Sequence, residues 1–204
     1  MGGNGSEKGC QDLTRGGVKT IFIPGTIDND VDDSEYSIGF DTAVDQCCQT
    51  INNLMPCMKT MENSCVVEVM GRHCSLIADA VAERAKADFC IKEKSDTKYR
   101  TIAAEIKRKR KIGQSTLIVL RENIVSITDF AQKLNDIVGD SCVKKQIVGY
   151  TQRGGKPTKV ELETASKFAT VAIKAICQKS DSQKILMQKG KVVAVKSTAL
   201  ETKD

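Results

Sequence analysis

The sequence is short of the residues on which several kinds of site depend. It has a single histidine, His73, and its nine cysteines include no C-x-x-C pair. Serine–histidine triads and histidine-ligated metal centres both need histidine, so one histidine argues strongly against either. Cys47 and Cys48 are adjacent, which suits neither a zinc site nor an ordinary disulfide framework. We therefore expect reduced, mostly buried thiols and a cytoplasmic protein.

Long apolar runs and aromatic residues are also scarce. No stretch is long enough to cross a bilayer and the N-terminus lacks a signal-peptide core, so we expect no membrane association. The net charge is +5, and much of it lies in the run KRKRK at 107–111. Ile102 and Ile106 precede this run at helical spacing, which favours the solvated end of a helix. A nucleic-acid patch is the less favoured alternative, because aromatic residues make up only 4% of the chain.

Apolar runs of strand-like composition alternate with amphipathic helical segments. The 204 residues are 40% hydrophobic, enough for a substantial core. The alternation predicts an α/β fold with mostly parallel sheets and helices on both faces. Around Gly190, the runs 184–187 and 191–195 predict a hairpin or two short edge strands. The expected strands are 18–23, 65–70, 88–91, 116–121 and 146–149, and the expected helices are about 40–55, 75–87, 97–111, 127–138 and 161–177.

The most informative segment is PGTIDND at 24–30, directly after the apolar run 18–23. Proline and glycine stop the strand, so Asp28 and Asp30 fall on the loop beyond it. Ligands of open α/β sheets bind beyond the carboxyl ends of strands. A carboxylate held there can take a proton from an attacking hydroxyl, while its neighbour helps to hold a metal or a water. The alternative is a solvated turn without chemistry.

Four further segments accompany PGTIDND along the chain. They are GGNGS at 2–6, SIGFDTA at 37–43, VVEVMGR at 66–72 and GYTQRGG at 149–155. In order and spacing, the five segments resemble those of the phosphofructokinase family, in particular its ATP-dependent 6-phosphofructokinases of the A type. The likeness runs from residue 2 to about residue 195. It implies Rossmann-type lobes and a phosphotransferase that uses ATP and Mg²⁺ to convert fructose 6-phosphate to fructose 1,6-bisphosphate in glycolysis.

The resemblance also implies roles for individual residues. Asp28 is the implied general base, Thr26 donates a hydrogen bond to the moving phosphoryl group, and Arg72 neutralises charge near the sugar. Asp30 would orient Asp28 or a Mg²⁺-bound water. The nucleotide would contact Gly3, Asn4, Gly5, Ser6 and Gly9, and the metal would contact Asn4 and Asp30. Fructose 6-phosphate would contact Thr26, Asp28, Met70, Gly71, Arg72, Glu122, Lys144, Tyr150 and Arg153.

Two glycines point to the phosphoryl donor. In the pyrophosphate-dependent relatives, an aspartate stands at the position of Gly5 and a lysine at the position of Gly25. Those side chains block the place of the α-phosphate and replace its charge. Because both positions hold glycine here, the resemblance favours ATP over pyrophosphate.

Several positions depart from the family's pattern. Asn4 stands where the family has a magnesium-linked aspartate, and Tyr150 where it often has histidine. Asn63 and Lys144 stand where it has arginines that reach the sugar phosphate of a neighbouring subunit. These departures keep a second interpretation open, a catalytically weak or inactive binding or regulatory subunit. GGNGS alone would also suit lipid and NAD kinases, but PGTIDND and MGR argue against them.

The likeness begins within the family's pattern rather than at its start. Members of the family have a strand, a Gly-rich phosphate loop and several βα units before the GGDGS segment. We therefore expect an N-terminally truncated or partial member, with a homo-oligomer as the complete form. The expected divisions are a remnant of the ATP-binding lobe with the catalytic loop at 1–38, a sugar-phosphate lobe at 39–160, and a C-terminal helix with short strands at 161–204.

Overall fold

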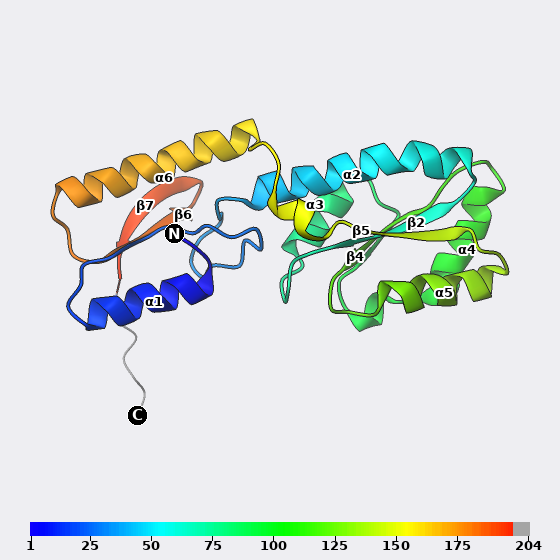
Figure 1. Ribbon diagram of the computed structural model, residues 1–204, viewed down its shortest axis with the longest axis horizontal. Helices are drawn as coiled ribbons and strands as arrows, with labels where there is room; N and C mark the ends of the chain where they lie inside the picture. The colour runs from blue at the N-terminus through cyan, green and yellow to red at the C-terminus, as the bar shows by residue number, and fades with distance from the viewer. Residues whose placement is uncertain (198–204) are drawn as a thin grey trace, which may run out of the picture. The chain divides into compact units, whose positions relative to one another are not determined.

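The computed structural model of the protein describes residues 1–197, which form two compact units. The terminal unit combines Met1–Thr42 with the described residues from Lys156 onward, and the central unit is Ala43–Gly155 (Figure 1). The end of the third expected division, residues 198–204, lies outside the described part of the chain. The C-terminal helix and strands therefore share one unit with the N-terminal segment.

The central unit is built on a four-stranded parallel sheet with the strand order β3-β4-β2-β5. Its inner strands β4 and β2 bury nearly all their side chains, whereas β5 lies at an edge. Helix α2 covers one face and α5 covers the other, with α4 packed against α5 (Figure 1). The bounds are α2 Phe40–Thr60, β2 Ser64–Val69, α3 Leu76–Arg84, β3 Phe89–Ile91, η1 Lys94–Asp96, α4 Tyr99–Arg110, β4 Leu117–Arg121, α5 Ile127–Val138, β5 Val143–Ile147 and η2 Gly149–Arg153.

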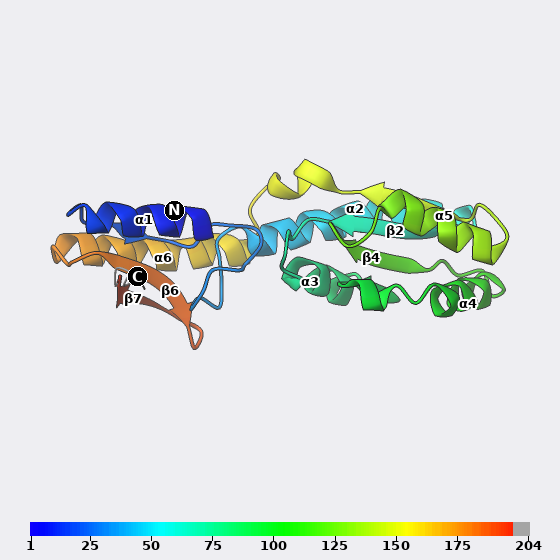
Figure 2. The same ribbon diagram turned by 90° about the horizontal axis from the view of Figure 1, so that it is seen from below.

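The terminal unit holds a three-stranded sheet and two helices. Its strands are β1 (Ile21–Phe22), β6 (Gln183–Gln188) and β7 (Lys191–Lys196), with β1 parallel and β7 antiparallel to β6. Helix α1 is Asn4–Arg15, and α6 is Lys159–Cys177. α6 packs along β6 and β7, where Phe168 is fully buried against Ile185 (Figures 1 and 2).

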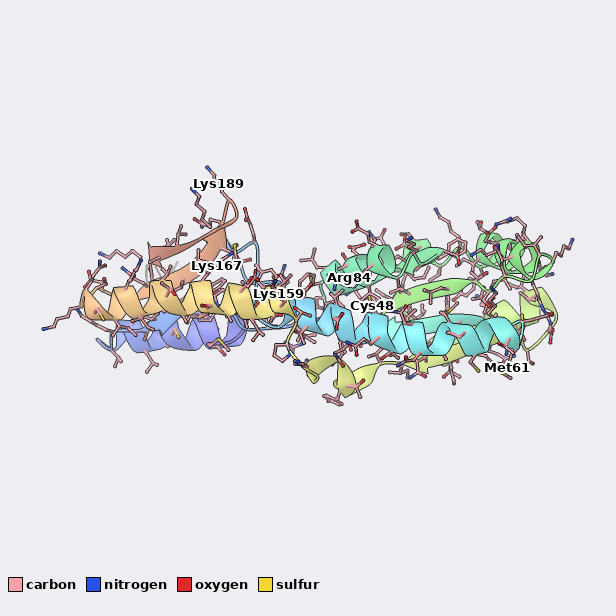
Figure 3. All side chains as sticks on the ribbon, turned by 90° about the horizontal axis from the view of Figure 1, so that it is seen from above. Cys48, Met61, Arg84, Lys159, Lys167 and Lys189 are labelled. Carbon is pink, nitrogen blue, oxygen red and sulfur yellow. The ribbon has the colours of Figure 1, made fainter. Side chains whose placement is uncertain are left out.

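The predicted fold class is confirmed, and so is the hairpin. β6 and β7 pair antiparallel through the turn at Lys189 and Gly190, and Lys189 stands at its tip (Figure 3). Both backbone N–H groups of this turn donate to the Glu35 carboxylate, at 2.8 and 2.9 Å. These two hydrogen bonds lower the pKa of Glu35 below its usual value, because they favour the charged form.

Three boundaries predicted from the sequence are wrong. The strand expected at 146–149 is β5 at Val143–Ile147. The polar residues at its start resemble a loop, but charged side chains suit an edge strand. The strand expected at 18–23 shortens to Ile21–Phe22. The helix expected at 40–55 continues to Thr60 through Pro56, although proline usually ends or kinks a helix.

Helix α1 has no counterpart in the sequence prediction. Its stretch of sequence contains two glycines and little apolar surface, so intrinsic propensity is poor. Tertiary contacts supply what propensity lacks. Glu7 forms an ion pair with Lys184 at 2.6 Å, with both side chains largely buried, and the Thr14 hydroxyl hydrogen-bonds to the Thr20 hydroxyl at 2.9 Å.

The basic run forms the last turn of α4, as the helical spacing predicted. Lys107 donates to the carbonyl of Ile137, Lys109 pairs with Asp88, and Arg110 pairs with Asp140. These contacts give much of the run a structural role within the central unit.

The expectation of mostly buried thiols is wrong: four of the nine cysteines are buried, three are half-buried and two are exposed. None of the nine cysteines, all of which lie in residues 1–197, forms a disulfide. Burial raises the pKa of the Cys47 and Cys65 thiols to about 12, which leaves them protonated. Cys48 lies beside Cys47 on α2 and is also buried (Figure 3). In residues 1–197, no helix is both long and apolar enough to cross a membrane.

Candidate functional site

In the terminal unit, the PGTIDND loop leaves β1 and is held from both sides. Gly2 forms a parallel bridge with Pro24, in which Gly2 N–H donates to Ile23 O at 3.1 Å and Gly25 N–H donates to Gly2 O at 2.9 Å. The Ser37 hydroxyl accepts a hydrogen bond from Thr26 N–H at 2.9 Å. Three hydrogen bonds therefore hold the loop.

Asp28 lies at the bend of this loop and exposes only 7% of its surface. Its backbone N–H donates to the Thr26 hydroxyl at 3.3 Å, so the two residues are fixed relative to each other. The hydroxyl hydrogen of Thr26 stays free to donate to another group. A carboxylate shielded from water beside a fixed hydroxyl donor suits proton abstraction next to a transferring group.

Asn4 and Asp30, the two residues expected at the metal, lie in contact. The side-chain amide of Asn4 donates to the Asp30 carbonyl at 3.2 Å and to its carboxylate at 3.4 Å. The Oδ1 atom of Asn29 is buried without a hydrogen-bond partner among the described residues, and a water of a hydrated cation could satisfy it. Mg²⁺ is commonly held by one or two carboxylates together with substrate phosphates. Asp30 and Asn4 fit that pattern with a single carboxylate, because Asn4 supplies an uncharged amide in place of a second aspartate.

Within residues 1–197, no cluster of three or more histidine, cysteine or acidic side chains could cage a metal ion. A metal at Asn4 and Asp30 would therefore need oxygens from a bound phosphate.

The segment expected to bind nucleotide forms the start of α1. Gly3 is the N-cap residue, and the backbone N–H groups of the first turn point out of the helix end. Such an end attracts phosphate groups. Gly5 and Gly9 lie one turn apart on the same face, and a Cβ added at either would meet no atom within 4 Å. Glycine thus leaves a bare strip on α1 where a phosphate chain could approach the backbone.

In the central unit, the turn after β2 has an unusual backbone. Gly71 has φ +154°, and a Cβ added there would lie 2.6 Å from the carbonyl oxygen of Cys74. Arg72 follows with φ +50°, in the left-handed region that side chains seldom adopt. The sequence therefore needs glycine at 71, and tertiary contacts must hold Arg72.

Glu122 holds this turn from the end of β4. Its Oε1 accepts hydrogen bonds from Gly71 N–H at 3.0 Å and Arg72 N–H at 2.8 Å. Its other oxygen accepts no hydrogen bond from the described residues, so it can still accept from a ligand hydroxyl. Glu122 also lines a cavity of about 440 Å³ together with Glu68. Burial, with a smaller contribution from the charge of Glu122, raises the pKa of Glu68.

Other residues of the predicted sugar-phosphate set are distributed along the sheet. Tyr150 and Arg153 lie on η2 beyond β5, and Tyr150 is 84% exposed. Lys144 pairs in register with Cys65 near the start of β2, so the structure does not bring it to the turn at Arg72. Its Nζ donates to Ser141 O at 2.8 Å.

Sequence reasoning missed two residues that hold the Arg72 turn. The side chain of Gln152, almost fully buried, accepts a hydrogen bond from Met70 N–H at 3.0 Å. Arg121 donates to Arg72 O at 2.7 Å. Gln152 lies inside the segment GYTQRGG, so its place there was an available signal. Arg121 gave no such signal, because nothing in the neighbouring sequence marks it.

Replacing Gly71 with alanine should lower the free energy of unfolding of the central unit by about 1–3 kcal/mol. The added methyl group would clash with Cys74 O, and φ of +154° suits only glycine. Urea denaturation followed by circular dichroism measures the change. Gly9→Ala is the matched control, since its Cβ meets open space inside a helix, where alanine is favoured. Equal unfolding free energies for Gly71→Ala and the parent would contradict the strained turn.

Comparisons with known proteins agree on one family. The family model described as phosphofructokinase matches residues 1–176. A probable ATP-dependent 6-phosphofructokinase of Malacoplasma penetrans is 35% identical over 201 residues, covering 95% of this chain and 62% of that protein. The ATP-dependent 6-phosphofructokinase of Clostridium acetobutylicum is 32% identical, with 95% and 60% covered. The chain thus spans about three-fifths of the length of these curated relatives.

Solved structures give the same fold at lower identity. A phosphofructokinase of Saccharomyces cerevisiae has a TM-score of 0.81 at 21% identity, covering 96% of this chain and 30% of that chain. A pyrophosphate-dependent phosphofructokinase of Nitrosospira multiformis has a TM-score of 0.78 at 18% identity, with 95% and 57% covered.

Proposed function

The chain belongs to the phosphofructokinase family, and from that premise we propose that it serves ATP-dependent phosphoryl transfer to fructose 6-phosphate. The product would be fructose 1,6-bisphosphate, and the pathway glycolysis. One observation carries the proposal above the others: Asp28 is buried in an ordered PGTIDND loop, fixed against the Thr26 hydroxyl. The names of the Malacoplasma penetrans and Clostridium acetobutylicum relatives, both ATP-dependent, support the choice of donor.

In this proposal, the terminal unit supplies the chemistry. Asp28 accepts the proton of the sugar hydroxyl that attacks, and Thr26 donates a hydrogen bond to the transferring group. The start of α1, from Gly3 to Gly9, receives the phosphates of ATP. Bound Mg²⁺ would neutralise phosphate charge, and Asn4 and Asp30 are the residues that would hold it.

The central unit would bind the sugar phosphate. The guanidinium groups of Arg72 and Arg153 suit phosphate oxygens, and the unoccupied oxygen of Glu122 suits sugar hydroxyls. Met70 and Gly71 supply backbone at the same turn, and Tyr150 lies on η2. Lys144 lies at the other end of β2, so we assign it to a second copy's ligand in a homo-oligomer. Nucleotide function then belongs to 1–38 and sugar-phosphate function to 39–160, with a cytoplasmic location.

A weakly active or inactive binding subunit is the second candidate, and Asn4 favours it. The amide of Asn4 already donates to the Asp30 carboxylate, so this pair is stable without a cation, whereas two aspartates there would repel each other. On this ground, and because the relatives are longer, we expect negligible kinase activity from residues 1–204 alone.

Calorimetric titration of the chain with fructose 6-phosphate and, separately, with Mg-ATP tests the assignment. We expect saturable binding of the sugar phosphate, with a higher affinity than that for Mg-ATP. Arg72→Ala should weaken it about tenfold to a hundredfold, the usual cost of a lost charged hydrogen bond. Unphosphorylated fructose is the ligand control, and Arg100→Ala, an exposed arginine on α4, is the protein control. Tight Mg-ATP binding without any response to the sugar phosphate would contradict the proposal.

A further inference from the structure

Arg121 is the last residue of β4 and contacts the loops that follow both neighbouring strands. Its Nε donates to Lys92 O, just beyond β3, at 3.0 Å. Its Nη1 donates to Arg72 O, in the turn beyond β2, at 2.7 Å. Since β4 lies between β3 and β2 in the sheet, one guanidinium bridges the carboxyl ends of three adjacent strands.

The contact with Arg72 completes the hydrogen bonding of the strained turn. Gln152 accepts from Met70 N–H, and Glu122 accepts from the N–H groups of Gly71 and Arg72. Arg121 supplies the donor for the Arg72 carbonyl. Side chains from the end of β4 and from η2 therefore fix the backbone on both sides of Arg72, which keeps its φ at +50°.

The other contact of Arg121 rests on a loop that is itself well anchored. The Asp96 carboxylate accepts hydrogen bonds from Lys92 N–H at 2.9 Å and Glu93 N–H at 3.0 Å, closing a capping box. The Lys92 ammonium also pairs with Asp79 on α3 at 2.9 Å. Arg121 thus braces the Arg72 turn against a fixed neighbour. No carboxylate among residues 1–197 forms an ion pair with Arg121, and its two hydrogen bonds both go to backbone carbonyls.

We propose that Arg121 is a positioning residue for the sugar-phosphate site, holding Arg72 in the left-handed conformation from which its side chain meets the phosphate. The proposal rests on the proposed function in so far as the ligand is a hexose phosphate. The geometry needs a fork of diverging donors, which arginine has and lysine lacks. Lysine keeps the charge but can reach the two carbonyls only with a single flexible ammonium.

The test compares Arg121→Ala, Arg121→Lys and the control Arg100→Ala with the parent. In the ligand-free protein, hydrogen exchange of the Gly71 and Arg72 amides reports how often the turn opens. We expect exchange about tenfold faster in Arg121→Ala, as for the loss of one charge-assisted hydrogen bond, and only partial recovery in Arg121→Lys. Affinity for fructose 6-phosphate, measured by calorimetry, should fall by a similar factor in the same order. Arg100→Ala should match the parent in both measurements.

Two results would overturn the role of Arg121. One is unchanged exchange at Gly71 and Arg72 in Arg121→Ala. The other is full recovery by lysine in both measurements, which would show that charge alone is sufficient. If the parent itself binds no sugar phosphate, the proposed function fails, while the exchange rates still decide whether Arg121 holds the turn. Should Arg121→Ala fail to fold, Arg121→Lys against the parent carries the same comparison.

Discussion

Replacing Asp28 with alanine should lower turnover roughly 10²- to 10⁴-fold in a catalytically complete protein, the usual contribution of a general base. Such a protein can be made by joining the unmatched part of the Malacoplasma penetrans relative to this chain. No neighbour in the loop can replace Asp28, because Asp30 is engaged with Asn4 and the Thr26 hydroxyl is not a base. Steady-state kinetics with a coupled assay for fructose 1,6-bisphosphate measures the change.

Two controls accompany this variant. Asp32→Ala removes an exposed carboxylate just beyond the loop, and its turnover should stay within about twofold of the parent, as for most surface substitutions. Binding of fructose 6-phosphate should change much less than turnover in Asp28→Ala, since the base acts in the chemical step. Turnover of Asp28→Ala within a few-fold of the parent would remove Asp28 from the role of base.

Elements with strong local signals were predictable from the sequence. α5 occupies the predicted range of 127–138, because Ser126 caps its start by accepting from Asp129 N–H and Gly139 ends it at φ +85°. The hairpin of β6 and β7 was likewise marked by Gly190 between two apolar runs. Both signals lie within a few residues of the element they define, so they can be recognised without knowledge of tertiary contacts.

Elements that depend on distant partners were not predictable. α1 is stabilised by Lys184, far along the chain from Glu7, and no local pattern reports that ion pair. The edge strand β5 carries Lys144 and Lys145, and such polar residues suit an edge strand. A prediction based on apolar runs does not recognise them as part of a strand.

The candidate site divides in the same way. Motifs identified Asp28, Arg72 and Glu122 as residues that would carry chemistry or bind ligand. They did not reveal that Glu122 and Arg121 hold the turn on which Arg72 stands, since those contacts join residues about fifty positions apart. Geometry of this kind arises from the order of strands in the sheet, and only the structure shows which loops become neighbours.

The completed protein should use ATP and ignore pyrophosphate. A Cβ at Gly5 would meet no atom of residues 1–197 within 4 Å. A Cβ at Gly25 would lie 2.6 Å from Cγ of Met1, a flexible and mostly exposed side chain that can move aside. In the proposed site, both positions would leave room for the α-phosphate. Gly5→Asp with Gly25→Lys should abolish use of ATP, because the new side chains occupy that room.

The most direct test of this account is the rate of fructose 1,6-bisphosphate formation by the fused protein, measured in parallel with Mg-ATP and with pyrophosphate as donor. Our account predicts turnover with ATP, no detectable turnover with pyrophosphate, and loss of the ATP reaction in the doubly substituted protein. Activity with pyrophosphate and none with ATP would contradict the account.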